Sequence, residues 1–254
     1  MIGVSDAPQL NLGRDRAVGS VKELIGALGE NEVHIWSVAL EVGAEELAEL
    51  ERLLSADECE RADRFHFAEH HRRYIVARSH LRLLLGRYLS RAPQALEFSY
   101  GAHGKPSLLT PSSDICFNLS HSHELALYAI GFGRALGVDV ERVRDNVAAM
   151  DLAERFFATD EVEALKKLPA EYRRRSFFDC WTRKEAYLKA RGDGISIELD
   201  TFSVSLEPGK RAALRRGPQI ERWQLAALEL ATGYAAAVCV EGAGWRLRLF
   251  SWPA

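Results

Sequence analysis

The sequence has few cysteines, and none of them form a pair at a metal-binding spacing. Its four cysteines, Cys59, Cys116, Cys180 and Cys239, lie far apart, with no CxxC pair. This pattern argues against a zinc site or a redox dithiol. Scattered single cysteines in a chain of 254 residues are typical of a reducing compartment, so we expect a cytoplasmic protein.

Long hydrophobic runs and an excess of basic charge are also missing. No apolar stretch approaches the roughly 18 to 20 residues of a membrane-spanning helix. The first 30 residues carry acids without an apolar core, so we expect no secretory signal. The 33 basic and 36 acidic residues give a formal net charge of −3, which favours no nucleic-acid partner. The hydrophobic content of 47% suits one large globular domain or two small ones.

The order of strand and helix patterns predicts two related lobes. Residues 1–31 are polar, and we interpret them as an N-terminal extension with one short helix around 21–28. The pattern then runs through a strand, helices and strands, and it repeats this order after a glycine-rich turn near 131–137. This order predicts an α+β fold with an N-terminal lobe over 32–134 and a C-terminal lobe over 135–254.

A predicted strand with two acids is the first candidate site. In the Gly-Val-Asp-Val-Glu sequence at 137–141, residues two apart face the same side, so Asp139 and Glu141 project together. Two neighbouring carboxylates repel each other unless a cation lies between them, and a hard divalent ion is the natural partner. A solvated edge strand with two ordinary acids is the alternative, and the pair alone favours that alternative.

A predicted helix over 172–191 supplies the second candidate site. Trp181, Glu185 and Lys189 are four residues apart and form one slowly turning stripe on it. Glu185 would add a third carboxylate to a metal site, and Lys189 would neutralise a phosphate. The alternative is a stabilising Glu–Lys pair beneath a packed tryptophan, which is the more common arrangement without further context.

Three further motifs are weaker. Ser120 and His121 lie in Asn-Leu-Ser-His-Ser at 118–122, but adjacent residues do not form a working triad and no G-x-S-x-G elbow is nearby. A phosphate-binding strand end and a satisfied turn both remain open for this motif. Gly-Lys-Pro at 104–106 is a common turn sequence. A predicted helical region carries arginines that are either solvated surface or phosphate clamps: Arg61, Arg64, Arg72, Arg73, Arg78 and Arg82.

Together and in this order, the motifs resemble those of the Sfp-type 4′-phosphopantetheinyl transferases. The most specific are Gly-Val-Asp-Val-Glu at 137–141 and Trp-x-x-Lys-Glu-Ala-x-x-Lys-Ala at 181–190. Asn-Leu-Ser-His-Ser and Gly-Lys-Pro precede them in the family's order, as do Arg-Ala-Asp-Arg-Phe at 61–65 and Arg-Arg-Tyr-Ile-Val-Ala-Arg at 72–78. The resemblance runs from about Val33 to Leu206.

The resemblance implies an α+β pseudodimer in one chain, with coenzyme A in the cleft between the lobes. By the family's motifs, Mg²⁺, or Mn²⁺ in its place, would be held by Asp139, Glu141 and Glu185. Lys189 would contact the pyrophosphate. The remaining contacts would come from Ser120 and His121 at the 3′-phosphate, Lys105 near the nucleotide, and Arg61 and Arg73 at the phosphates. Where the family often has a further basic residue, this chain has Glu58, so we expect a different outer rim of the phosphate site.

The implied reaction moves 4′-phosphopantetheine from coenzyme A to a serine of an acyl or peptidyl carrier protein and releases 3′,5′-ADP. Glu185, directly or through a water, would be the base for the serine hydroxyl, and Lys189 would neutralise charge. The alternatives are a metal-dependent phosphohydrolase, with Asp139 and Glu141 activating water, and a nucleotide-binding module without turnover. Since both halves supply site residues, we expect a monomer.

Overall fold

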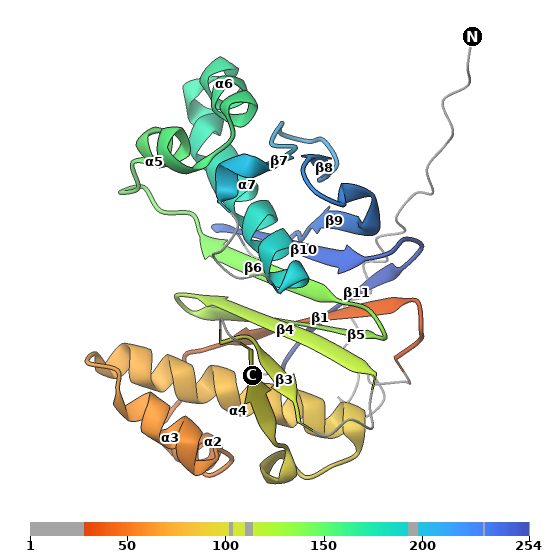
Figure 1. The fold of residues 1–254 in the computed structure, drawn as a ribbon. Coiled ribbons are helices and arrows are strands. Elements are labelled where there is room, and N and C mark those ends of the chain that lie inside the picture. The colour runs from red at the N-terminus through yellow and green to blue at the C-terminus, as the bar shows by residue number, and fades with distance from the viewer. Residues whose placement is uncertain (1–27, 102–103, 110–113, 193–197, 231, 254) are drawn as a thin grey trace.

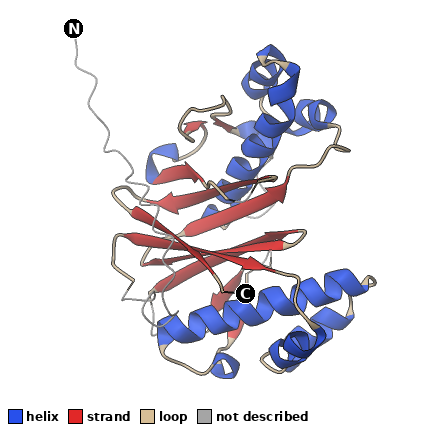
Figure 2. Cartoon of the chain, turned by 180° about the vertical axis from the view of Figure 1, so that it is seen from behind, coloured by secondary structure: helices blue, strands red, loops and turns tan. Residues whose placement is uncertain are grey.

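Two sheets pack against each other at the centre of the molecule, and helices cover their outer faces (Figures 1 and 2). The computed structural model describes residues 28–101, 104–109, 114–192, 198–230 and 232–253. The expected short helix around 21–28 and most of the extension 1–31 therefore lie outside the described residues. No helix in these segments combines the length and apolar character that crossing a membrane requires.

The first lobe contains a four-stranded sheet. Its strand order is β11 (Arg246–Ser251), β1 (Glu32–Ala39), β5 (Leu125–Phe132) and β4 (Ile115–Ser122). Strand β5 pairs antiparallel with both β1 and β4. The helices on this side are α2 (Ala44–Glu51), α3 (Ala56–Asp63) and α4 (Ala68–Leu89). A hairpin of β2 (Phe98–Tyr100) and β3 (Pro106–Leu108) follows them.

The second lobe has a three-stranded antiparallel sheet. Its strand order is β6 (Leu136–Arg142), β10 (Tyr234–Glu241) and β9 (Trp223–Ala227). The helices of this lobe are α5 (Ala149–Phe156), α6 (Thr159–Lys167) and α7 (Ala170–Arg191). A small sheet of β7 (Ser203–Val204) and β8 (Leu214–Arg216) lies beside them, and short 3-10 turns span Leu199–Thr201 and Ile220–Arg222. A third 3-10 turn, Pro93–Ala95, follows α4 in the first lobe.

Strand residues alternate between two buried cores, as the period of an extended chain requires. In β1, Val33 and Ile35 pack in the core shared by the two sheets, whereas Trp36 and Val38 pack with residues of α4. Val138 of β6 joins the core between the sheets. Both faces of the central strands are therefore buried, and the predicted two-lobed α+β fold is confirmed.

The last strand returns to the first lobe. β11 pairs in parallel with β1, with Glu32 opposite Arg246 and Ser37 opposite Ser251. The sequence division places this strand in the C-terminal lobe, over 135–254, but its ladder belongs to the first sheet. The boundary at residue 135 stays a prediction, and the returning strand ties the two lobes together.

Candidate active site

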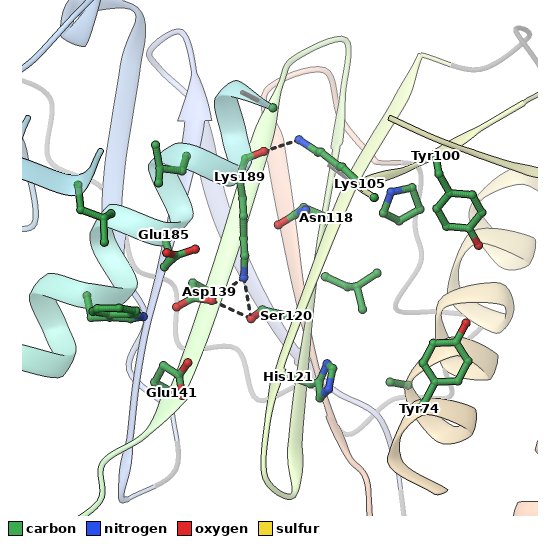
Figure 3. Close-up of a pocket in the computed structure, with 18 of the residues that line it drawn as sticks. Tyr74, Tyr100, Lys105, Asn118, Ser120, His121, Asp139, Glu141, Glu185 and Lys189 are labelled. Atoms are coloured by element: carbon green, nitrogen blue, oxygen red, sulfur yellow. Dashed lines mark hydrogen bonds and ion pairs between the residues drawn. The ribbon is translucent and has the colours of Figure 1, made fainter. Parts of the chain in front are cut away.

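A cleft of about 1140 Å³ lies between the lobes, with α3, α4 and β2 on one side and β6 and α7 on the other (Figure 3). It is lined by most of the residues that the motifs single out: Arg61, Lys105, Ser120, His121, Asp139, Glu141, Glu185 and Lys189. Arg73 instead lines a smaller neighbouring cavity of about 440 Å³, which shares His121 and Glu141 with the cleft. The structure thus brings eight of the nine expected residues into one cleft and places Arg73 beside it.

Strand β6 and helix α7 together position the carboxylates. Asp139 is only 3% exposed, and its Oδ1 accepts hydrogen bonds from Ser120 Oγ (2.8 Å) and from Lys189 Nζ (2.6 Å). Its Oδ2 is buried and has no hydrogen-bond partner among the described residues. Figure 3 shows Glu141 and Glu185 on the same wall as Asp139. A buried carboxylate oxygen without a partner is costly and is a natural ligand for a cation.

The electrostatics of this wall also favour a cation. Burial raises the pKa of Glu141 above its usual value, and the charge of Asp139 raises it further. The pKa of Glu185 is raised by the same two causes in the same order. Both carboxylates are therefore destabilised in their charged form, and a positive ion among them would reverse this effect.

The donor atoms fit a hard divalent ion, but the site is not preassembled. Among the described residues, no three acidic, histidine or cysteine side chains are grouped closely enough to hold a metal ion as they stand. The ammonium of Lys189 supplies the positive charge at Asp139 in this structure. Lys189 of α7 pairs with Asp139 of β6 on the same wall of the cleft, so the expected alternative of a Glu185–Lys189 helix pair is not what the structure shows.

Alternate residues of β4 hold the two sheets together beside the carboxylates. Asn118 Oδ1 accepts from the backbone N–H of Val138 (2.8 Å), Ser120 Oγ donates to Asp139 Oδ1 (2.8 Å), and Ser122 Oγ donates to Glu141 Oε2 (2.8 Å). The Asn-Leu-Ser-His-Ser motif is thus a strand rather than a turn. Its two serines bind the acids of β6, and its asparagine binds the backbone of the same strand.

Lys105 and His121 lie at the cleft in different ways. Lys105 Nζ donates to the backbone carbonyls of Lys189 (2.5 Å) and Leu136 (3.2 Å), so it bridges the lobes, and burial lowers its pKa. His121 opens to solvent in the cleft, yet protein atoms surround much of its ring. That partial burial lowers its pKa, and the cationic Lys189 and Arg73 nearby lower it further.

Gly137 allows helix α7 to approach β6. A Cβ atom at this position would lie 2.3 Å from both the carbonyl oxygen of Ala186 and the backbone nitrogen of Ala190. No side chain fits at that distance. The glycine of the Gly-Val-Asp-Val-Glu motif therefore brings Glu185 and Lys189 within reach of Asp139.

Glu58 is a buried structural residue and not part of the outer rim. It is 1% exposed and forms ion pairs with Arg78 and with Arg82 Nε, the latter at 2.6 Å. It also accepts from the backbone N–H of Ser55 (3.0 Å) in the capping box that begins α3. The expectation that Glu58 alters the rim is corrected, because its charge is neutralised inside the first lobe.

The sequence comparisons agree with the cleft's composition. Residues 135–239 match the 4′-phosphopantetheinyl transferase superfamily, and residues 41–131 match the N-terminal part of 4′-phosphopantetheinyl transferases. The 4′-phosphopantetheinyl transferase HetI of Nostoc sp. is 42% identical over 218 residues, which cover 85% of this chain and 90% of HetI. This chain belongs to the 4′-phosphopantetheinyl transferase family.

Two further sequence relatives carry the same description. A putative 4′-phosphopantetheinyl transferase of Synechocystis is 35% identical over 70% of this chain and 73% of its own length. The transferase Sfp of Bacillus subtilis is 26% identical over 73% of this chain and 81% of its own. A solved holo-[acyl-carrier-protein] synthase of Thermotoga maritima aligns with a TM-score of 0.36 and 21% identity, over 45% of this chain and 64% of that one.

As a 4′-phosphopantetheinyl transferase, the protein is an enzyme that transfers the phosphopantetheine group from coenzyme A to carrier proteins. The expected reaction class is thereby confirmed. The roles of individual residues rest on the geometry of the cleft.

Several residues of this transferase's cleft were not singled out by sequence reasoning. Asn118 of the cleft and Ser122 of the smaller cavity had a signal, because polar residues at every second position of a strand face one side. Tyr74 and Tyr100 also line the cleft, and each lies within or beside a motif that was interpreted through its charged members alone. Nothing local marked these two rings as cleft residues, since their placement depends on how α4 and β2 pack.

Proposed function

We propose that Asp139, Glu141 and Glu185 hold a divalent cation, Mg²⁺ or Mn²⁺, in the cleft where coenzyme A binds. The observation that carries this proposal is the buried, unpartnered Oδ2 of Asp139 on a wall shared by all three carboxylates. Oxygen donors of this kind are the ligands that Mg²⁺ prefers. When bound, the ion would polarise the pyrophosphate and take up charge on the departing 3′,5′-ADP.

Two residues of α7 would act on the reacting groups. Lys189 would neutralise the pyrophosphate, since its ammonium already lies at the centre of the site between Ser120 and Asp139. Glu185 would accept the proton of the carrier serine, directly or through a water. Its side chain lines the cleft on the wall that also carries Asp139 and Glu141, where the reacting groups would meet.

The nucleotide end of coenzyme A would lie toward the first lobe. His121 stands where the main cleft meets the smaller cavity, so a 3′-phosphate placed there would meet both His121 and Arg73. Arg73 already pairs with Glu41 and Glu69, at 3.1 and 2.5 Å, and would have to share its donors. Ser120, Lys105 and Arg61 would complete the contacts, with Lys105 also keeping the lobes in register.

The acceptor would be a serine of an acyl or peptidyl carrier protein in the cytoplasm, and the enzyme would work as a monomer. One chain supplies both walls of the cleft, which supports this assignment. Neither a nucleic acid nor a membrane is needed by the proposed chemistry.

Intact-mass analysis of an apo carrier protein tests the proposal. Incubation with this enzyme, coenzyme A and Mg²⁺ should add the mass of one phosphopantetheine, and the gain should be absent in EDTA and return with Mn²⁺. Calorimetric titration of Mn²⁺ into the enzyme gives a readout that does not depend on turnover, and Asp139→Asn should abolish it. Turnover that persists in EDTA would contradict the metal proposal, and hydrolysis of coenzyme A without a carrier would favour a phosphohydrolase.

A further inference from the structure

A buried acid is connected to the wall of the cleft through one arginine. Both oxygens of Glu58 are used: one accepts from Arg78 and the other from Arg82 and the backbone of Ser55. Although burial by itself would raise the pKa of Glu58, the two arginines lower it below its usual value. Glu58 is therefore charged, and this buried group carries one net positive charge from two arginines and one glutamate.

The two arginines have different tasks. Arg82 binds structural groups only, because its Nη1 donates to the carbonyls of Pro93 (2.9 Å) and Leu96 (3.0 Å) and its Nη2 donates to Ser55 Oγ (3.0 Å). Arg78 instead extends to the cleft, which it lines. Its Nη2 donates to the hydroxyl of Tyr100 (2.6 Å), and its guanidinium lies 4.2 Å from the centre of the Phe98 ring.

Tyr100 forms part of the cleft wall next to Arg61. Tyr100 is 39% exposed, and its ring lines the cleft opposite the carboxylates, beside Tyr74 (Figure 3). The guanidinium carbon of Arg61 lies 5.8 Å from the centre of the Tyr100 ring and 6.0 Å from that of Tyr74. Both distances are in the range of a cation–π contact, so the two rings hold the Arg61 guanidinium at the cleft.

We propose that Tyr100 is a further coenzyme A-binding residue and that Glu58 and Arg78 are its positioning residues. Glu58 orients Arg78, Arg78 holds the Tyr100 hydroxyl, and the fixed ring presents one face to the ligand and to Arg61. This inference rests on the proposed binding of coenzyme A by Arg61. The acid at position 58 thus maintains the phosphate end of the cleft from within the lobe, and the net positive charge of its group favours an anionic ligand.

Substitutions at Tyr100 test this arrangement without disturbing the buried ion pairs. Tyr100→Phe keeps the ring and removes the bond to Arg78, whereas Tyr100→Ala removes the ring as well. Tyr172→Phe and Tyr172→Ala are matched controls, because Tyr172 is 50% exposed and does not line the cleft. The measurements are the Kd of coenzyme A by calorimetry, and kcat and KM in the carrier-protein assay.

The expected result is a loss of binding with little change in turnover. Loss of the hydroxyl contact with Arg78 in Tyr100→Phe should weaken binding about threefold. The additional loss of the ring and its cation–π contact in Tyr100→Ala should weaken it about tenfold. KM for coenzyme A should rise in parallel while kcat stays within about twofold. The Tyr172 variants should bind coenzyme A as the unaltered enzyme does. If Tyr100→Phe binds much more tightly than Tyr100→Ala, the ring itself contacts the ligand.

A double-mutant cycle separates this inference from the proposed function. If Tyr100 acts partly by positioning Arg61, Tyr100→Ala should weaken binding by much less in an Arg61→Ala background than alone, because residues that act together are not additive. Fully multiplicative losses would overturn the positioning of Arg61 by Tyr100. Unchanged binding in Tyr100→Ala while Arg61→Ala weakens it would overturn the role of Tyr100 as a whole and leave the proposed binding of coenzyme A by Arg61 standing. Unchanged binding in Arg61→Ala would instead overturn the assignment of Arg61 to coenzyme A, and the inference with it.

Discussion

Neighbouring residues in the most specific motif have opposite surroundings. Lys184 is fully buried, and its Nζ pairs with Glu161 Oε2 (2.7 Å) and donates to the carbonyls of Leu199 (2.7 Å) and Phe202 (2.6 Å). Glu185, the next residue, faces the cleft. The helix therefore directs one of the two side chains into the core of the second lobe and the other into the cleft.

Replacement of Lys184 should lower the stability of the fold and should not act on a specific step of the reaction. Lys184→Met leaves Glu161 without its counter-charge in the core, which should lower the free energy of unfolding by about 3–5 kcal/mol. Urea denaturation measures this, with Lys167→Met on exposed α6 surface as the control, expected within about 1 kcal/mol. A destabilisation no larger than that of the control would show that this ion pair does not support the fold.

The three carboxylates should behave as one unit in mutagenesis. Asp139→Ala, Glu141→Ala and Glu185→Ala should each lower kcat by about a hundredfold or more, because a cation held by all three is worth several kcal/mol. Any two changes together should cost little more than one, since removal of one ligand already disrupts the site. Steady-state assays at saturating Mg²⁺ decide this, and independent, multiplicative losses would mean that the acids do not share an ion.

His34 gives the fold a pH dependence in the acidic range. Its ring is fully buried, and burial lowers its pKa from the usual 6.5 to about 4, despite the attraction of Glu32. Between these values the unfolded chain binds a proton that the folded chain excludes. Stability contributed by the neutral ring is therefore present above pH 6.5 and is lost as the pH falls toward 4, by about 3 kcal/mol.

The contribution of His34 can be isolated by comparison with a non-titrating side chain. The free energy of unfolding of the unaltered enzyme should fall more steeply between pH 6.5 and 4 than that of His34→Gln. Across this range the unaltered enzyme should lose about 3 kcal/mol more than the variant. Parallel pH profiles for the two proteins would show that the ring is protonated in the folded state. Denaturation at a series of pH values provides the measurement.

At the scale of elements, the contact between β6 and α7 sets the geometry of the site. Gly137→Ala would force a methyl group to within 2.3 Å of two backbone atoms of α7, so the helix must move away from Asp139. We expect a loss of at least about 3 kcal/mol of stability, as for severe overpacking, together with lost transferase activity. Gly43→Ala is the matched control, because a Cβ there meets no atom within 4 Å. Near-normal stability of Gly137→Ala would mean that the two elements are not held this closely.

Helices and strands could be predicted from the sequence where the spacing of polar and apolar residues follows directly from local backbone geometry. The alternation around Asp139 and the four-residue spacing of Glu185 and Lys189 follow from strand and helix geometry, so their faces could be inferred from the sequence. The capping box that Ser55 and Glu58 form at the start of α3 is a local signal of the same kind. These signals need no knowledge of which elements pack together.

Features that depend on packing between distant elements could not be predicted in this way. The burial of Glu58 follows from Arg78 and Arg82 one turn apart on another helix, whereas a charged residue is usually exposed. Lys105 donates to carbonyl groups of the second lobe, which no local pattern indicates. Arg73 lies beside the cleft because α4 turns it toward Glu41 and Glu69.

At the scale of the whole molecule, one chain builds the complete cleft. Lys105 and His121 come from the first lobe, and Glu185 and Lys189 come from the second. We therefore predict full activity as a monomer of 28.4 kDa. Light scattering coupled to gel filtration should give this mass, and specific activity should stay constant on dilution. Activity that falls as a dimer dissociates would show that a second chain contributes to the site.

The parallel pairing of β1 with β11 has a mechanical consequence. Because Glu32 lies opposite Arg246 and Ser37 opposite Ser251, a force applied at the start of β1 and at the end of β11 slides the two strands past each other. The evenly spaced hydrogen bonds of a parallel ladder then bear the load together instead of opening one at a time. Stretching the chain between its two ends would therefore have to shear this ladder as a unit before β1 and β11 separate.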